Sequence, residues 1–209
     1  ENPFAASAAK VALAAYEALS IEARGAKSAE SGGEAALPSY ESSKLAKLAE
    51  LVATRWPESP EAASAANVLI QAALRENRLE DAEALLERLP AESRGAAQLS
   101  LGAGLWTKYL RATAGSRENP SEEAIALREK AGAILGKGFA ALREQGTHNY
   151  AAAVGALYLS QYLLANGDAE QAVSVLENEK VGPLTLVEGG AETVQNAEFI
   201  LGTYTAALR

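Results

Sequence analysis

The side chain best suited to catalysis or metal binding is His148, the only histidine of the chain, in the stretch QGTHNY. A histidine titrates near neutral pH, so it can serve as a general base or as a metal ligand. Either role needs a second ligand or a nucleophile, and neither lies close to His148 in the sequence. Since HExxH, CxxC, GxSxG and GxxxxGK[ST] are also absent, we predict a structural histidine, no catalytic residue, no cofactor and no bound metal.

Glycine pairs suggest phosphate binding at two places. The run LGAGLW carries Gly102 and Gly104, and AGAILGKG carries three more glycines, Gly132, Gly136 and Gly138. The run LGAGLW lacks the third glycine and the preceding strand that a dinucleotide-binding loop needs, and we interpret AGAILGKG in the same way. We therefore interpret these glycines as sites where two helices pack closely.

Groups of carboxylates could also perform chemistry. They occur at Glu58/Glu61, Glu80/Asp81/Glu83 and Glu122/Glu123. All three groups fall near expected helix N-termini, where negative charge is stabilised by the helix dipole. We predict a structural role for them, and a role in core packing for Trp56 and Trp106.

The elements that position these residues are expected to be helices. Apolar residues recur at helical spacing, and caps and breakers divide the chain into about nine helices with short turns. Lys180 to Gly190 is expected to be irregular, with room for a short extended piece. The expected helices cover residues 2–25, 39–55, 60–76, 79–89, 95–115, 121–145, 148–167, 168–179 and 191–209.

Composition limits the possible partners and locations. With 19 basic and 27 acidic residues the formal net charge is −8, which disfavours binding to nucleic acid phosphates. No apolar run reaches the length of about 18 residues that spans a bilayer, so we expect no membrane insertion. The chain has no cysteine and no methionine. This composition suggests a processed or excised piece, and an exported, periplasmic or cell-envelope location is favoured over the cytoplasm.

One pattern occurs twice, 90 residues apart. Aligning Ala82 with Ala172 also aligns Leu86 with Leu176, both in the second helix of an expected hairpin. In the turn before that helix, Asn77 aligns with Gly167, and both residue types tolerate positive φ. A small residue where two helices cross allows close approach, and a hairpin that cannot bury its apolar face alone must stack on neighbours.

These residues resemble the tetratricopeptide repeat (TPR). The stretch from Arg55 to Pro90 is also similar to helical units of bacterial outer-membrane assembly lipoproteins and cell-division coordinators. The resemblance covers about residues 56–209. It implies an all-α, right-handed α-solenoid of stacked antiparallel helical hairpins. The chain would form a single domain, residues 1–209, with N-terminal helices in residues 1–55.

The resemblance implies a non-catalytic scaffold that binds a protein or peptide on its concave face. The polar or amphipathic positions expected to line that face are Asn67, Gln71, Tyr158 and Gln161. Two alternatives stay open. One is an α-helical enzyme domain of the α/α-barrel kind acting on glycans, and the other is a structural segment of a larger protein.

The last expected helix has the apolar spacing of a first repeat helix, and no partner helix follows it in the printed sequence. Its apolar residues include Phe199, Ile200, Leu201 and Tyr204. We therefore expect an apolar stripe that is exposed, folded back on the array, or paired with another copy, and a chain that is part of a longer repeat protein.

Overall fold

The fold was taken from a computed structural model, which describes residues 5, 8–9, 11–16, 18–19, 40–56, 59–115, 119–145, 150–189 and 196–208. Within these ranges every regular element is a helix and no strand occurs. This confirms the all-α class. His148 and Glu58 lie outside the described residues, so the predictions for them stay predictions.

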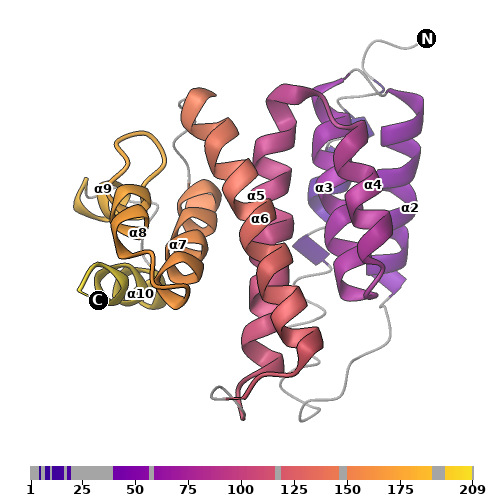
Figure 1. The fold of residues 1–209 in the computed structure, drawn as a ribbon. Helices are drawn as coiled ribbons and strands as arrows, with labels where there is room; N and C mark the ends of the chain where they lie inside the picture. Colours follow the sequence, from indigo (N-terminus) through magenta and orange to yellow (C-terminus); the bar gives the residue numbers. More distant parts are fainter. Residues whose placement is uncertain are drawn as a thin grey trace. The chain divides into compact units, whose positions relative to one another are not determined.

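The helices follow the expected order along the chain (Figure 1). Residues 11–16, within the first expected helix, are also helical. Most boundaries agree with the expected ranges, although α5 begins four residues earlier than expected. The labelled helices are α2 (Tyr40–Arg55), α3 (Pro60–Arg75), α4 (Leu79–Arg88), α5 (Ala91–Ala112), α6 (Glu122–Gln145), α7 (Tyr150–Ala165), α8 (Ala169–Leu176), α9 (Pro183–Glu188) and α10 (Ala197–Ala207).

The expectation of an irregular or extended segment at Lys180–Gly190 is wrong for Pro183–Glu188, because these residues form α9. Pro183 stands at the start of α9, where its missing N–H costs nothing and its fixed φ suits a helix. Both Pro183 and Leu186 are buried. Tertiary packing thus stabilises a six-residue helix that would not persist alone.

Expected helix starts are confirmed by side-chain caps. The Oγ of Ser59 accepts a hydrogen bond from the backbone N–H of Ala62, at 3.2 Å, with Pro60 in the first turn. The Oγ of Ser121 accepts one from the N–H of Ala124, also at 3.2 Å. The carboxylates predicted to favour helix N-termini lie in first turns of α3, α4 and α6, at Glu61, Glu80, Asp81, Glu122 and Glu123.

The chain divides into two compact units, Glu1–Pro90 and Ala91–Arg209. In unit 1, α3 packs against both α2 and α4. Its core joins Leu13 to Leu45, Ala49 and Val52 of α2 and Ala65 of α3. The unit boundary lies between α4 and α5.

In unit 2, α5 and α6 form an antiparallel pair that crosses at glycines. A Cβ atom added to Gly138 would lie 2.8 Å from the carbonyl oxygen of Gly95 and 2.8 Å from the backbone nitrogen of Leu99. One added to Gly102 would lie 2.6 Å from Leu135. These glycines therefore permit the close helix contact expected from the sequence. Gly136 differs, because nothing lies within 4 Å of its added Cβ.

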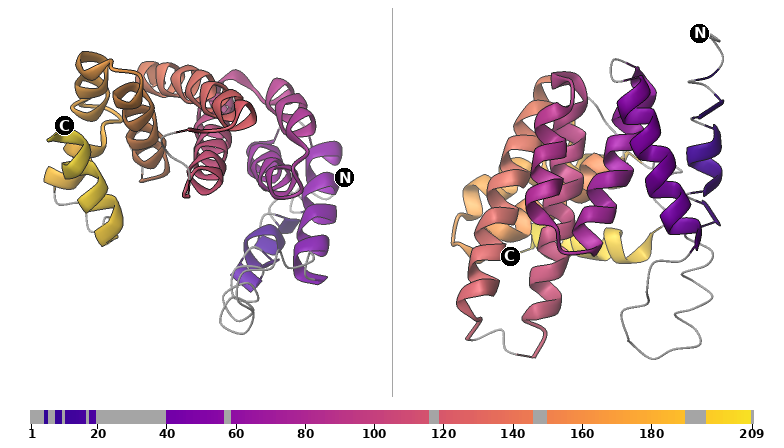
Figure 2. Two further views of the ribbon diagram at one scale, coloured as in Figure 1. Left: turned by 60° about the horizontal axis from the view of Figure 1, so that its bottom comes forward. Right: turned by 90° about the vertical axis from the view of Figure 1, so that its right-hand side faces the viewer.

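The remaining helices of unit 2 are arranged in succession. Helix α7 packs against both α5 and α6, and α8, α9 and α10 pack against α7 (Figure 2). The core on this side of α7 contains Ala153, Leu157, Leu176, Leu186, Phe199 and Ala206. Within unit 2, the α5–α6 pair thus packs against α7, and the α7–α8 pair packs against α9 and α10.

The two aligned turns have the same backbone geometry. Asn77 has a φ of 60° and Gly167 a φ of 81°, which confirms the expected positive φ at both positions. The N–H of Arg78 donates to the carbonyl of Ala73 at 2.8 Å. At the second turn the N–H of Asp168 donates to the carbonyl of Leu163 at 2.9 Å. Both helices therefore end in the same C-terminal motif, in which a left-handed residue allows a bond across five residues.

This geometry predicts that Gly167→Ala lowers the free energy of unfolding by about 1 kcal/mol, because an L-residue is strained in the left-handed region. Steric contact plays no part, since nothing lies within 4 Å of an added Cβ. Gly115 is the matched control: its site is equally open and its φ lies outside that region. Urea denaturation of both variants measures the difference, and equal midpoints would contradict the assigned backbone conformation.

Candidate functional site

Three aromatic side chains from two helices of unit 2 form an aromatic cluster: Trp106 and Tyr109 of α5 and Tyr162 of α7. The Trp106 and Tyr109 ring centroids lie 5.1 Å apart with planes tilted by 42°. The Trp106 and Tyr162 centroids lie 6.3 Å apart at 87°, an edge-to-face contact. Trp106 is buried, as predicted, whereas both tyrosines are partly exposed. The cluster thus joins the core to the surface.

The indole of Trp106 orients one of the predicted site residues. Its Nε1–H donates a hydrogen bond to Oε1 of Gln161 at 3.0 Å. A buried indole N–H needs such an acceptor, so the bond fixes the Gln161 amide. The acceptor oxygen of that amide thus points toward the buried Trp106.

Tyr162 connects α7 to α6. Its ring lies directly over Gly132, where an added Cβ would come within 2.3 Å of the ring. Its hydroxyl donates a hydrogen bond to Oε2 of Glu129 at 2.8 Å. The other oxygen of Glu129 accepts from Arg128, with an Nη2 to Oε1 distance of 2.8 Å. A phenol, a carboxylate and a guanidinium thus form a connected surface network beside the aromatic cluster.

The network shifts the pKa values of its members. The hydrogen bond from Tyr162, followed by that from Arg128, lowers the pKa of the Glu129 carboxyl. Burial, and then the hydrogen bond to Glu129, raises the pKa of the Tyr162 phenol. The hydrogen bond to Glu129 raises the pKa of Arg128 as well. All three groups therefore keep their ordinary charge states at neutral pH.

We predict that Tyr162→Phe raises the pKa of Glu129 toward its ordinary value. The lowered folded-state pKa of Glu129 stabilises the fold above the unfolded-state pKa of about 4.3. That contribution is lost as the pH falls through the folded-state value. It is small, because the Glu129 side chain is half exposed. An NMR titration of the Glu129 carboxyl measures the shift, with Tyr158→Phe on the same helix as the control that leaves it unchanged. An unaltered Glu129 pKa in Tyr162→Phe would contradict the hydrogen bond.

The four predicted site residues fall into two pairs, one in each unit. Asn67 and Gln71 lie one helical turn apart on α3, and Tyr158 and Gln161 lie together on α7, all partly exposed. The Oδ1 atom of Asn67 is buried and accepts no hydrogen bond from the described residues. Each pair thus lies on one face of its own helix.

Sequence reasoning missed Tyr109, Arg128, Glu129 and Tyr162. The contact between Tyr109 and Trp106 could have been predicted, because the two residues are three positions apart and so share a helix face. The contact between Tyr162 and Glu129 depends on the register between α6 and α7, which local patterns do not specify.

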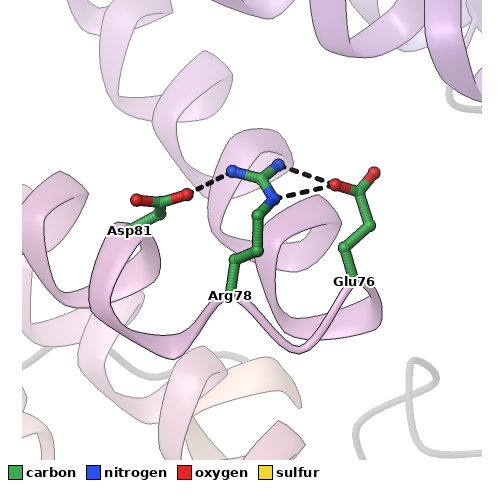
Figure 3. A network of polar contacts seen from close by, with 3 residues as sticks. All are labelled: Glu76, Arg78 and Asp81. Carbon is green, nitrogen blue, oxygen red and sulfur yellow. Dashed lines mark hydrogen bonds and ion pairs between the residues drawn. The ribbon is translucent and has the colours of Figure 1, made fainter.

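A second polar network lies in unit 1, at the turn between α3 and α4 (Figure 3). Arg78 donates to Oε2 of Glu76 from Nε at 2.9 Å and forms an ion pair with Asp81. The hydrogen bond with Asp81, and then that with Glu76, raises the pKa of Arg78. All three side chains are about half exposed, so the network holds the turn rather than marking a reactive site.

The turn after α8 borders an open groove of about 650 Å³ in unit 2. The charged residues that line this groove are Arg143 and Glu144 of α6 and Glu177, Glu179 and Lys180 after α8. Both signs of charge line the groove, so its charge gives no basis for assigning an anion or a cation to it. Among the described residues no three His, Cys, Asp or Glu side chains come together as metal ligands would.

These features define a helical-hairpin protein with a polar and aromatic surface on α5, α6 and α7. Searches against protein-family models, curated proteins and solved structures found no match. In the part of the chain that the structure describes, no helix combines the length and apolar character needed to cross a bilayer.

Proposed function

We propose that the chain is a TPR-like helical-repeat protein that acts as a non-catalytic scaffold for a protein or peptide partner. The observation that carries the proposal is the repetition of one hairpin turn at positions 90 residues apart. Asn77 and Gly167 share a positive φ, and Ala82 and Ala172 are both fully buried in the helix that follows. Repeated hairpins with buried small residues are typical of helical arrays that bind partners along a surface.

The surface of α7 supplies contacts suited to a peptide. Tyr158 is partly exposed and offers an amphipathic ring. The amide of Gln161 is held by Trp106, so its N–H groups can donate to a backbone carbonyl without first losing rotational freedom. On α3 the predicted contact positions are Asn67 and Gln71, both partly exposed. Amide side chains bind a peptide backbone without requiring a charged partner, which suits α7, a helix with no charged residue.

Site-specific photocrosslinking tests this proposal in the host cell. A photoreactive phenylalanine analogue replaces Tyr158 in the full chain, and the control places it at the exposed Ala140 of α6. We expect a discrete protein adduct at position 158 and none at position 140. Equal adducts at both positions, or no protein adduct at position 158, would overturn the proposal.

A further inference from the structure

Helix α10 has one buried and one exposed apolar face. Phe199, Thr203 and Ala206 lie in the core of unit 2. On the opposite side four exposed residues recur at intervals of four, three and four, the spacing of a single helix face. This α10 stripe consists of Ala197, Leu201, Tyr204 and Leu208, with exposed fractions of 69% for Leu201, 43% for Tyr204 and 88% for Leu208.

The stripe is well defined as a surface. The Oδ1 of Asn196 accepts hydrogen bonds from the N–H groups of Glu198 and Phe199, at 2.9 and 3.1 Å, and so caps the start of α10. The buried face then fixes the helix against α7, α8 and α9. Of the apolar residues expected to form a stripe on this helix, Leu201 and Tyr204 are exposed, whereas Phe199 is buried.

The charge on α10 indicates what can cover the stripe. Glu198 is the only charged residue between Ala197 and Leu208, although the chain as a whole has a net charge of −8. Two copies of an acidic protein repel one another over most of their surfaces. The stripe therefore offers a surface where two copies can meet with little repulsion.

The position of Glu198 also favours one orientation of such a pair. In an antiparallel pairing centred between Leu201 and Tyr204, each Leu201 meets the Tyr204 of the other copy. Ala197 then meets Leu208, so a small side chain opposes a large one. Each Glu198 lies opposite Ala207, which separates the two carboxylates by about 13 Å along the axis at 1.5 Å per residue. This exceeds the screening length of about 8 Å at physiological salt, whereas a parallel pair would place them side by side.

We propose that the α10 stripe binds the same stripe of a second copy of this chain, antiparallel, to form a homodimer. The paired surface is short, because an eleven-residue helix is about 16 Å long. It is smaller than the roughly 800 Å² per partner of a standard stable interface. The dimer is accordingly weak and reversible. The homodimer does not depend on the proposed scaffold function.

Sedimentation equilibrium of the full chain between about 10 µM and 1 mM tests the dimer. We expect reversible dimerisation that Leu201→Glu weakens at least tenfold. Leu51→Glu is the matched control, because Leu51 is a 55% exposed leucine on α2 of unit 1. A monomer at all concentrations would leave the stripe to a different partner and overturn the proposal, as would equal weakening by both variants.

Cysteine crosslinking tests the orientation, and the absence of native cysteine leaves no background. Ala197→Cys and Leu208→Cys variants are prepared separately, mixed and oxidised. An antiparallel pair brings position 197 of one copy next to position 208 of the other, so the mixed disulfide dominates. Dominant 197–197 and 208–208 products would indicate a parallel pair and overturn the antiparallel arrangement. Circular dichroism confirms that each variant remains helical.

Discussion

We expect Gly138→Ala to lower the free energy of unfolding by about 3 kcal/mol, a large effect for one methyl group. The added Cβ would meet the carbonyl oxygen of Gly95 and the backbone nitrogen of Leu99, both at 2.8 Å. Backbone atoms cannot rotate away as the end of a side chain can, so the α5 and α6 axes must separate. Separation also loosens the neighbouring contact of Gly102 with Leu135.

Gly136→Ala is the internal control, because Gly136 lies on the same helix with open space around its added Cβ. There the substitution only gains helix propensity, so it should raise the free energy of unfolding by about 1 kcal/mol. Chemical denaturation of the two variants should therefore show changes of opposite sign in the free energy of unfolding. Shifts of the same sign would show that the crossing at Gly138 is wrongly placed.

The second large effect is expected at the small residues of the repeated hairpins. Ala82→Leu and Ala172→Leu should each lower the free energy of unfolding by about 2 kcal/mol through overpacking. Both alanines have no exposed surface, so the larger side chain can enter only by displacing neighbouring helices. Similar losses at both positions are expected because the two hairpins share one turn geometry.

Ala84→Leu is the control for this pair, since Ala84 is exposed on the same helix as Ala82. It should change stability by less than about 0.5 kcal/mol. Denaturant midpoints measure all three variants. If Ala82→Leu and Ala172→Leu both kept the wild-type midpoint, the alignment of the two hairpins would lose its physical basis.

Local signals were enough to predict most helix boundaries. Ser59 with Pro60 identified the start of α3, because a capping hydroxyl and a fixed φ act within a few residues. Asn77 and Gly167 identified the turns for the same reason. The wrong prediction at α9 shows the limit of local reasoning. Gly182 and Pro183 suggest an irregular segment, whereas the helix is stabilised by burial of Leu186 in the core.

The candidate site was predictable only in part. Gln161, which accepts the hydrogen bond from Trp106, was among the positions named from the alignment of first helices, and that alignment needs only helical periodicity. The aromatic cluster requires knowing that Trp106 and Tyr162 meet, and that contact depends on how α5 and α7 are placed. Gly132 indicated close packing, but the sequence around it does not show that the neighbour is the Tyr162 side chain rather than the backbone of another helix. Gly136 shows the opposite error, since its type suggested a crossing that does not exist.

The glycines of α6 have a consequence for how unit 2 forms. Gly132, Gly136 and Gly138 together weaken the intrinsic helix tendency of this segment by about 3 kcal/mol relative to alanine. An isolated peptide of residues 122–145 would therefore be mostly unstructured, although the helix is the longest in the described chain. Its helical state depends on docking with α5 and α7. Formation of α6 and its docking must then be one cooperative event, and its central backbone amides would exchange with solvent only when the α5–α6 pair opens as a whole.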